Sequence, residues 1–307
     1  MNTIMTKFTI LALMFSLVSL VGSSRAEAKL AVVAATTDLA SLVSEIGGDD
    51  VSVDAIAKGT QDPHFIEAKP SYMTKLSHAD LVVAVGLDLE VGWMPSILRG
   101  ARNPKINPGN QGYLELGSAI DPLEVPEGKI SRAEGDVHPF GNPHFTLDPI
   151  RMGVAGLALA ERLGELDTAH AAAYMTRAKA FQKRMEDKTK LWQARVEKSK
   201  VKSAVSYHKT LTYFFTRFHI QNPAILEPKP GIPPTSGHII EVIQMIREKK
   251  IPLIMVENFF DPTVTNRIKE EVPGIHIAVV PVSVDGAPGI KTLDDLYEKL
   301  VSTIEGK

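Results

Sequence analysis

The 307-residue sequence contains no cysteine, so the chain forms no disulfides and offers no thiolate to a metal ion or substrate. It also lacks an excess of either charge, with 34 basic and 36 acidic residues and a formal net charge of −2. Binding to nucleic acid or to an anionic membrane surface depends largely on clustered positive charge. We therefore expect neither of these as the partner.

Common catalytic signatures are also missing. The sequence has no phosphate-binding loop, no Gly-x-Ser-x-Gly elbow and no His-Glu-x-x-His motif. We therefore expect a binding protein that is not an enzyme. The alternative is an exported metallohydrolase, in which a bound metal activates water and Glu67 or Glu257 acts as the general base.

The N-terminal region contains one apolar run of 15 residues, Phe8 to Gly22, followed by small residues that end in Ala26-Glu27-Ala28. This run is shorter than the roughly 20 residues that a membrane-spanning helix needs. Residues 1–28 are therefore predicted to be a secretory signal peptide cleaved after Ala28. No cysteine near this point could carry a lipid. We expect a soluble periplasmic protein.

Beyond residue 28, β-rich runs alternate with segments of helical spacing. Strands are predicted at 30–35, 51–56, 81–85, 113–116, 204–206, 224–226, 252–256 and 277–280. Between the two groups of strands, apolar residues recur at helical steps from about 167 to 199, which predicts one helix about 48 Å long. The pattern indicates an α/β fold with two lobes, each with a parallel sheet, joined by this helix. We expect an N-terminal lobe at 29–166, the connecting helix at 167–200 and a C-terminal lobe at 201–307.

Three histidines follow predicted strands or lie in short loops. They are His64 in Asp62-Pro63-His64, His144 in Asn142-Pro143-His144, and His208 after the strand at 204–206. Proline stiffens the first two loops, and open α/β sheets bind ligands beyond the carboxyl ends of their strands. Asp285 occupies the equivalent place after the last strand. Three imidazoles and one carboxylate suit a four-coordinate zinc ion, and less selectively manganese or iron.

Other residues near these loops have competing interpretations. A single histidine is more often a surface or hydrogen-bonded residue than a ligand, and only the shared placement supports the set. Asp261 competes with Asp285, but it is better explained as a helix N-cap. His138 lies in the predicted 121–141 loop and could pass a metal inward. Glu67 and Glu257 could accept the free ring N–H of a ligand histidine, or form ordinary salt bridges.

Taken together, these motifs resemble the periplasmic solute-binding proteins of zinc and manganese ABC importers, the metal-binding cluster A-I family. The resemblance covers essentially the whole chain after residue 28. It is carried by Asp62-Pro63-His64 with Glu67, Ala79-Asp80-Leu81-Val82 leading to Gly86 and Glu90, Asn142-Pro143-His144-Phe145 with Leu147-Asp148-Pro149, and His208 before Tyr213-Phe214-Phe215.

The resemblance implies a metal held at the cleft between the lobes, with His64 and His144 from the first lobe and His208 and Asp285 from the second. A histidine at position 208 resembles zinc-type members, whereas manganese-type members often have glutamate there. The implied function is capture of a divalent ion by a monomer and its delivery to an inner-membrane ABC permease. Unlike the best-known zinc importers, the 121–141 loop has no histidine-rich run, and no cysteine pair is present.

Overall fold

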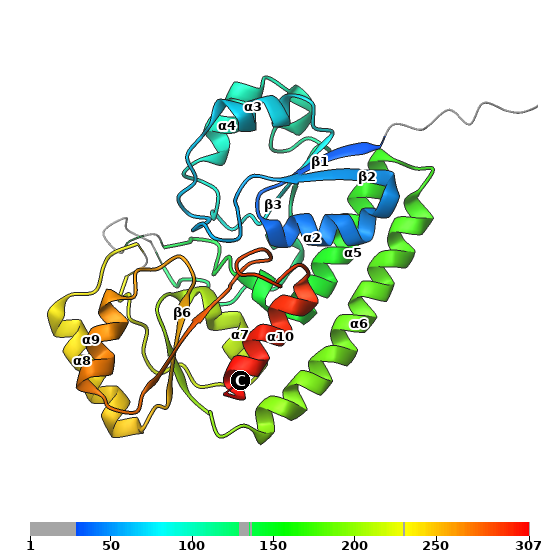
Figure 1. Ribbon diagram of the computed structural model, residues 1–307. Helices are drawn as coiled ribbons and strands as arrows, with labels where there is room; N and C mark the ends of the chain where they lie inside the picture. Colours follow the sequence, from blue (N-terminus) through cyan, green and yellow to red (C-terminus); the bar gives the residue numbers. More distant parts are fainter. Residues whose placement is uncertain (1–28, 129–134, 136, 230, 307) are drawn as a thin grey trace, which may run out of the picture.

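The computed structural model describes residues 29–128, 135, 137–229 and 231–306, so the predicted signal peptide lies outside the described residues. The described chain is an α/β protein with two separate parallel sheets (Figure 1). None of the helices in these ranges is both long and apolar enough to cross a membrane.

The first sheet has the strand order β2-β1-β3-β4, and all its neighbours pair in parallel. Its strands are β1 (Leu30–Ala34), β2 (Val51–Ala55), β3 (Leu81–Ala84) and β4 (Tyr113–Glu115). Helices α3 (Pro70–Ser77) and α4 (Met94–Ala101) lie on one face, and α2 (Thr37–Gly47) and α5 (Pro149–Leu166) on the other (Figure 1). Val33 packs with the α3 and α4 side and Val32 with the α2 side. Both faces are apolar because both are covered.

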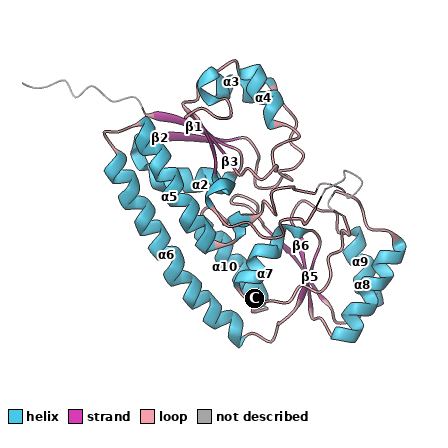
Figure 2. Ribbon diagram, turned by 180° about the vertical axis from the view of Figure 1, so that it is seen from behind, coloured by secondary structure: helices cyan, strands magenta, loops and turns pink. Residues whose placement is uncertain are grey.

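The second sheet has the order β5-β6-β7, again parallel. Its strands are β5 (Ala204–Ser206), β6 (Leu253–Glu257) and β7 (His276–Val280). Helices α8 (Ser236–Lys249) and α9 (Thr263–Glu271) cover one face, while α7 (Thr212–Arg217) and α10 (Leu293–Ile304) lie on the other side (Figure 2). The strand predicted at 224–226 is wrong: this segment forms only an isolated bridge between Ser206 and Ile225.

The predicted long helix is α6 (Ala171–Lys198), which runs along both halves of the molecule (Figure 1). Its 28 residues correspond to about 42 Å, less than predicted because the helix begins after His170. The buried stripe consists of Tyr174, Ala178, Phe181, Met185, Thr189, Trp192 and Val196. Thr189 is the one polar member of this stripe, and it continues the helical spacing between Met185 and Trp192.

One buried cluster contains side chains from both sheets, among them Val32 of β1 and Met255 of β6. Helices α6 and α10 pack within it as well. The first half also contacts the last loop directly, because the backbone N–H of Val284 donates to Oδ1 of Asp38 at 2.7 Å. The division at 29–166, 167–200 and 201–307 therefore stays a prediction, since the two sheets share a core.

Short 3-10 helices complete the fold. They span Gly48–Asp50, Pro104–Ile106, Leu116–Ala119, Phe145–Leu147 and Lys209–Leu211. The last two follow His144 and His208 directly and position the backbone of these histidines.

Candidate metal centre

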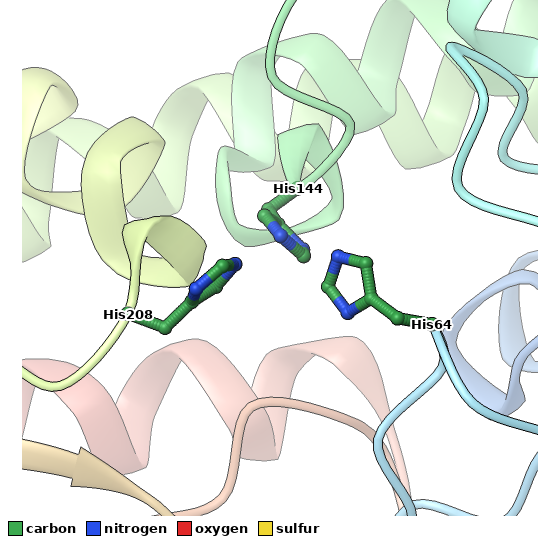
Figure 3. Close-up of side chains that lie close together, drawn as sticks. All are labelled: His64, His144 and His208. Atoms are coloured by element: carbon green, nitrogen blue, oxygen red, sulfur yellow. The ribbon is translucent and has the colours of Figure 1, made fainter. Parts of the chain in front are cut away.

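Three loops from distant parts of the chain bring His64, His144 and His208 together (Figure 3). One possible ligand atom from each ring lies within 4.8 Å of the corresponding atoms of the other two. The ring centroids are 5.1 to 5.4 Å apart in pairs. His64 follows β2, His144 precedes the 3-10 helix Phe145–Leu147, and His208 follows β5. Three of the four predicted ligands thus face one small volume.

The first two loops use the same local hydrogen bond. Oδ1 of Asp62 accepts from the backbone N–H of His64 at 3.0 Å, and Oδ1 of Asn142 accepts from that of His144 at 2.9 Å. In each case an Asx side chain bonds the backbone two residues on, across a proline that has no N–H. This hydrogen bond explains why an Asp or Asn precedes Pro-His in both motifs.

Contacts from elsewhere in the fold fix these loops. Nε1 of Trp93 donates to the backbone oxygen of Pro63 at 2.9 Å. Nδ2 of Asn142 donates to the backbone oxygen of Lys209 at 3.1 Å, and the hydroxyl of Tyr213 donates to the oxygen of Asn142 at 2.7 Å. Since Lys209 follows His208, Asn142 links the second loop to the third.

Carboxylates orient two of the rings. Nδ1 of His64 lies 2.6 Å from Oδ1 of Asp62, and Nδ1 of His208 lies 2.6 Å from Oε2 of Glu227. Although burial opposes it, the hydrogen bonds from the ring and the backbone of His64 lower the pKa of Asp62. An ionised carboxylate can only accept, so we assign the ring proton of each imidazole to Nδ1. Nε2 of each ring is then free to bind a metal.

Of the two interpretations of Glu67 and Glu257, the one as ring acceptors is wrong, and Glu67 instead forms the ordinary salt bridge that was the alternative. The Glu67 side chain is 81% exposed and pairs with Lys69 at 3.6 Å. Glu257 is buried, and its Oε1 accepts from the backbone N–H of His208 at 3.3 Å rather than from the ring. Burial raises the pKa of Glu257 to about 8. Sequence reasoning overlooked Asp62, whose role the Asx-Pro-His pattern could have indicated, and Glu227, which no local pattern indicates.

His144 is buried, with 6% of the residue exposed, much as His208 is at 5%. Its Nε2 atom has no hydrogen-bond partner among the described residues. Burial lowers its pKa well below the usual 6.5, and the neighbouring histidines 64, 208 and 138 lower it further. A buried acceptor without a partner costs about 1–3 kcal/mol. A neutral imidazole in this position is therefore suited to donate its lone pair to a cation.

Asp285, the predicted fourth ligand, does not join this group. Its side chain is 50% exposed, and Oδ1 lies 2.6 Å from Nζ of Lys291. Its backbone has a left-handed φ of 60°. The neighbour that the structure places beside the imidazoles is instead His138, whose Nε2 is 3.3 Å from Nε2 of His64.

Two hollows adjoin the cluster. One is lined by His138, His144 and His208 together with Glu124 and Lys209, among others. The other is lined by Asp62, His64, Glu227 and Phe260, and it also reaches His208. His208 therefore lies between the two hollows.

Comparison with known sequences gives a match over nearly the whole described chain. The family model described as zinc-uptake complex component A, periplasmic (ZnuA), matches residues 32–306. The chain is 27% identical over 241 residues to the metal ABC transporter substrate-binding lipoprotein ScbA of Streptococcus cristatus, covering 76% of this chain and 73% of that protein. It is 26% identical over 267 residues to the manganese ABC transporter substrate-binding lipoprotein PsaA of Streptococcus anginosus, covering 82% of each.

Solved structures share the fold. A crystal structure of ZnuA superposes with a TM-score of 0.76 at 20% identity, covering 91% of this chain and 99% of that one. The laminin-binding protein Lmb of Streptococcus agalactiae, described as having adhesin and metal transporting activity, gives 0.73 at 23% identity, with coverages of 89% and 98%. These likenesses confirm the predicted α/β fold with two parallel sheets and a long helix.

Proposed function

The chain belongs to the family of periplasmic zinc-uptake complex component A proteins, and on this premise we propose that it binds a divalent metal ion, zinc in the first place, and delivers it to an ABC permease of the inner membrane. The proposed ligands are His64, His144 and His208. We also propose that the protein acts in the periplasm as a monomer, with residues 1–28 as its signal peptide.

The convergence of the three imidazoles carries the proposal. Their ligand atoms lie within 4.8 Å of one another, although 80 residues separate His64 from His144 and 64 separate His144 from His208. The ring proton of His64 and of His208 is held by a carboxylate, and Nε2 of His144 has no other partner among the described residues. Histidines that bind a metal usually donate their other ring N–H to such a carboxylate.

The donor set supports zinc over manganese. Zinc prefers imidazole nitrogen and accepts four-coordinate sites, whereas manganese prefers carboxylate and water oxygens. The group of converging ligand atoms in the described residues contains three nitrogens and no carboxylate oxygen. The alternative is a manganese- or iron-binding member of the same family, because several relatives are named manganese transporter proteins.

The cargo is bound without being chemically changed in this proposal. A metallohydrolase needs a general base near an open coordination position. Glu67 is exposed and pairs with Lys69, and Glu257 is engaged with the backbone of His208. The positions of these two glutamates support binding rather than catalysis. A screen of the zinc-loaded protein with ester, phosphoester and peptide substrates tests this directly.

Zinc titration tests the proposed site. Metal-free protein should bind one zinc ion per chain when it competes with a chromophoric chelator. His144→Ala should weaken binding by at least about 100-fold, because a lost ligand costs more than the 10–100-fold typical of an outer partner. The control is His78→Ala, which removes an exposed histidine at the end of α3. Equal affinities of the two variants would contradict the proposed ligand set.

A further inference from the structure

A fourth histidine, His138, lies beside His64 and lines one hollow together with His144 and His208. Its Nε2 atom lies 3.3 Å from Nε2 of His64. Its ring centroid is 5.3 Å from that of His64 and 6.4 Å from that of His144. The centroid distance to His64 is within the range found among the three proposed ligands, and the distance to His144 is about 1 Å longer.

The backbone that follows β3 holds the His138 ring. The ring is hydrogen-bonded to the backbone at Leu87 and Asp88. We assign these bonds to Nδ1, because Nε2 of His138 lies beside Nε2 of His64. Leu87 and Asp88 both have left-handed backbones, with φ of 54° and 66°. Such conformations are uncommon for residues other than glycine. His138 is thus held by the first lobe, not left pointing to solvent.

The close pair of Nε2 atoms then brings two lone pairs together. The His64 proton is on Nδ1, which lies 2.6 Å from Asp62, so Nε2 of His64 carries a lone pair. We assign the ring proton of His138 to Nδ1 as well, because the ring is hydrogen-bonded there to the backbone, so its Nε2 also carries a lone pair. Without a proton between them, two lone pairs at 3.3 Å repel each other. A cation bound to both nitrogens removes this repulsion.

The distance also fits metal coordination. Two imidazole nitrogens bound to zinc at 2.0–2.1 Å in a tetrahedral site are about 3.4 Å apart. We propose that His138 is the fourth ligand of the metal ion, in place of Asp285, so that the site is built from four imidazole nitrogens. This inference rests on the metal binding proposed above and adds a ligand to it.

Four neutral imidazoles leave the full charge of a divalent cation in the site. The carboxylates of Asp62 and Glu227 lie behind two of the rings, each 2.6 Å from an Nδ1 atom. They balance the charge without coordinating the metal. A site with only nitrogen ligands discriminates against manganese more strongly than one that includes the Asp285 carboxylate.

The ligand count and the affinity test this inference together. The probe is zinc itself, bound to the full chain beginning at Lys29. X-ray absorption at the zinc edge should show four imidazoles in the parent protein and three in His138→Ala. Chelator competition should show at least about a 100-fold loss of zinc affinity for His138→Ala. Asp285→Asn should keep both the four imidazoles and the affinity, and so should His78→Ala.

The possible outcomes separate the inference from the function on which it rests. Three imidazoles and an oxygen in the parent protein, with zinc affinity lost in Asp285→Asn and kept in His138→Ala, overturn the inference and leave zinc binding intact. If the parent protein binds no zinc at all, the proposed function itself fails. A variant that unfolds is recognised by its circular dichroism spectrum. His138→Gln then replaces His138→Ala, since it keeps much of the side-chain volume.

Discussion

Oε2 of Glu227 lies 2.6 Å from Nδ1 of His208, and the two side chains are only 7% and 6% exposed. Nineteen residues separate the pair in the sequence. The carboxylate fixes both the orientation of the imidazole and the nitrogen that carries its proton. This contact has direct consequences for metal affinity and selectivity.

Replacing Glu227 with glutamine should weaken zinc binding by about 10–100-fold. The amide can donate as well as accept and carries no charge, so it stabilises the required ring orientation less well and no longer offsets the charge of the cation. Chelator competition measures the loss. The matched control is Glu67→Gln, whose side chain is exposed and pairs with Lys69. A similar loss in both variants would mean that general surface charge, rather than this contact, controls affinity.

Replacing His208 with glutamate should shift preference toward manganese, because manganese favours carboxylate oxygen. In this structure the new carboxylate faces Glu227, and the two negative charges repel each other. We therefore expect the shift to be clearest in the double variant His208→Glu with Glu227→Gln. The ratio of zinc to manganese affinity should fall by about tenfold or more in that protein. Calorimetric titration with each metal checks this, and an unchanged ratio would argue against position 208 as a determinant of selectivity.

The buried Asp38 should make stability depend on pH. Burial raises its pKa to about 7, although hydrogen bonds from Val284 and Ser283 oppose the increase. In the unfolded chain an aspartate titrates near 3.9. The stability that the folded protein gains from the protonated Asp38 is therefore fully present below about pH 4. It is lost as the pH rises through 7, because the folded protein must then ionise a buried carboxyl.

Asp38→Asn removes this titration while its amide oxygen can still accept from Val284. Between pH 5 and pH 8 the variant should therefore gain about 1–3 kcal/mol in the free energy of unfolding relative to the parent protein. Urea denaturation at the two pH values measures the difference. The control is Asp261→Asn, because bonds from Thr263 lower the pKa of that exposed carboxyl, so its titration is complete below pH 5. A gain independent of pH would point to packing rather than ionisation.

The shared core predicts that metal binding moves the two halves little. Val32 of the first sheet and Met255 of the second belong to one buried cluster, and α6 runs along both halves. The radius of gyration should change by less than about 1 Å when zinc binds, as in other pre-organised sites. X-ray scattering from metal-free and zinc-loaded protein measures this change.

A distance across the molecule gives an independent check. Because the chain has no cysteine, spin labels can be attached at Thr74→Cys on α3 and Glu248→Cys on α8 without removing any native thiol. Both positions are exposed. A change of several ångströms between the labels would show that the halves separate despite their common core.

The sequence alone determined the features that depend on neighbouring residues. Strand and helix periodicity indicated the alternating α/β pattern, and a single buried stripe indicated α6. Two rigid histidine loops were recognisable without a structure, in the motifs Asp62-Pro63-His64 and Asn142-Pro143-His144. In each, the side chain of the first residue accepts a hydrogen bond from the backbone N–H two residues further on. The strand predicted at 224–226 failed because short apolar runs do not specify whether a partner strand is available.

Tertiary structure alone decided which distant groups meet these loops. Glu227, rather than Glu67 or Glu257, bonds the ring of His208, because the chain after Ile225 returns alongside β5. His138 is beside His64, while Asp285 pairs with Lys291 six residues further on. Contacts of this kind depend on how separate loops are placed by the packing of two sheets and α6, and residue spacing along the chain does not encode that placement. The residue types of the site could therefore be predicted from the sequence, but the partners of each ring were decided by the fold.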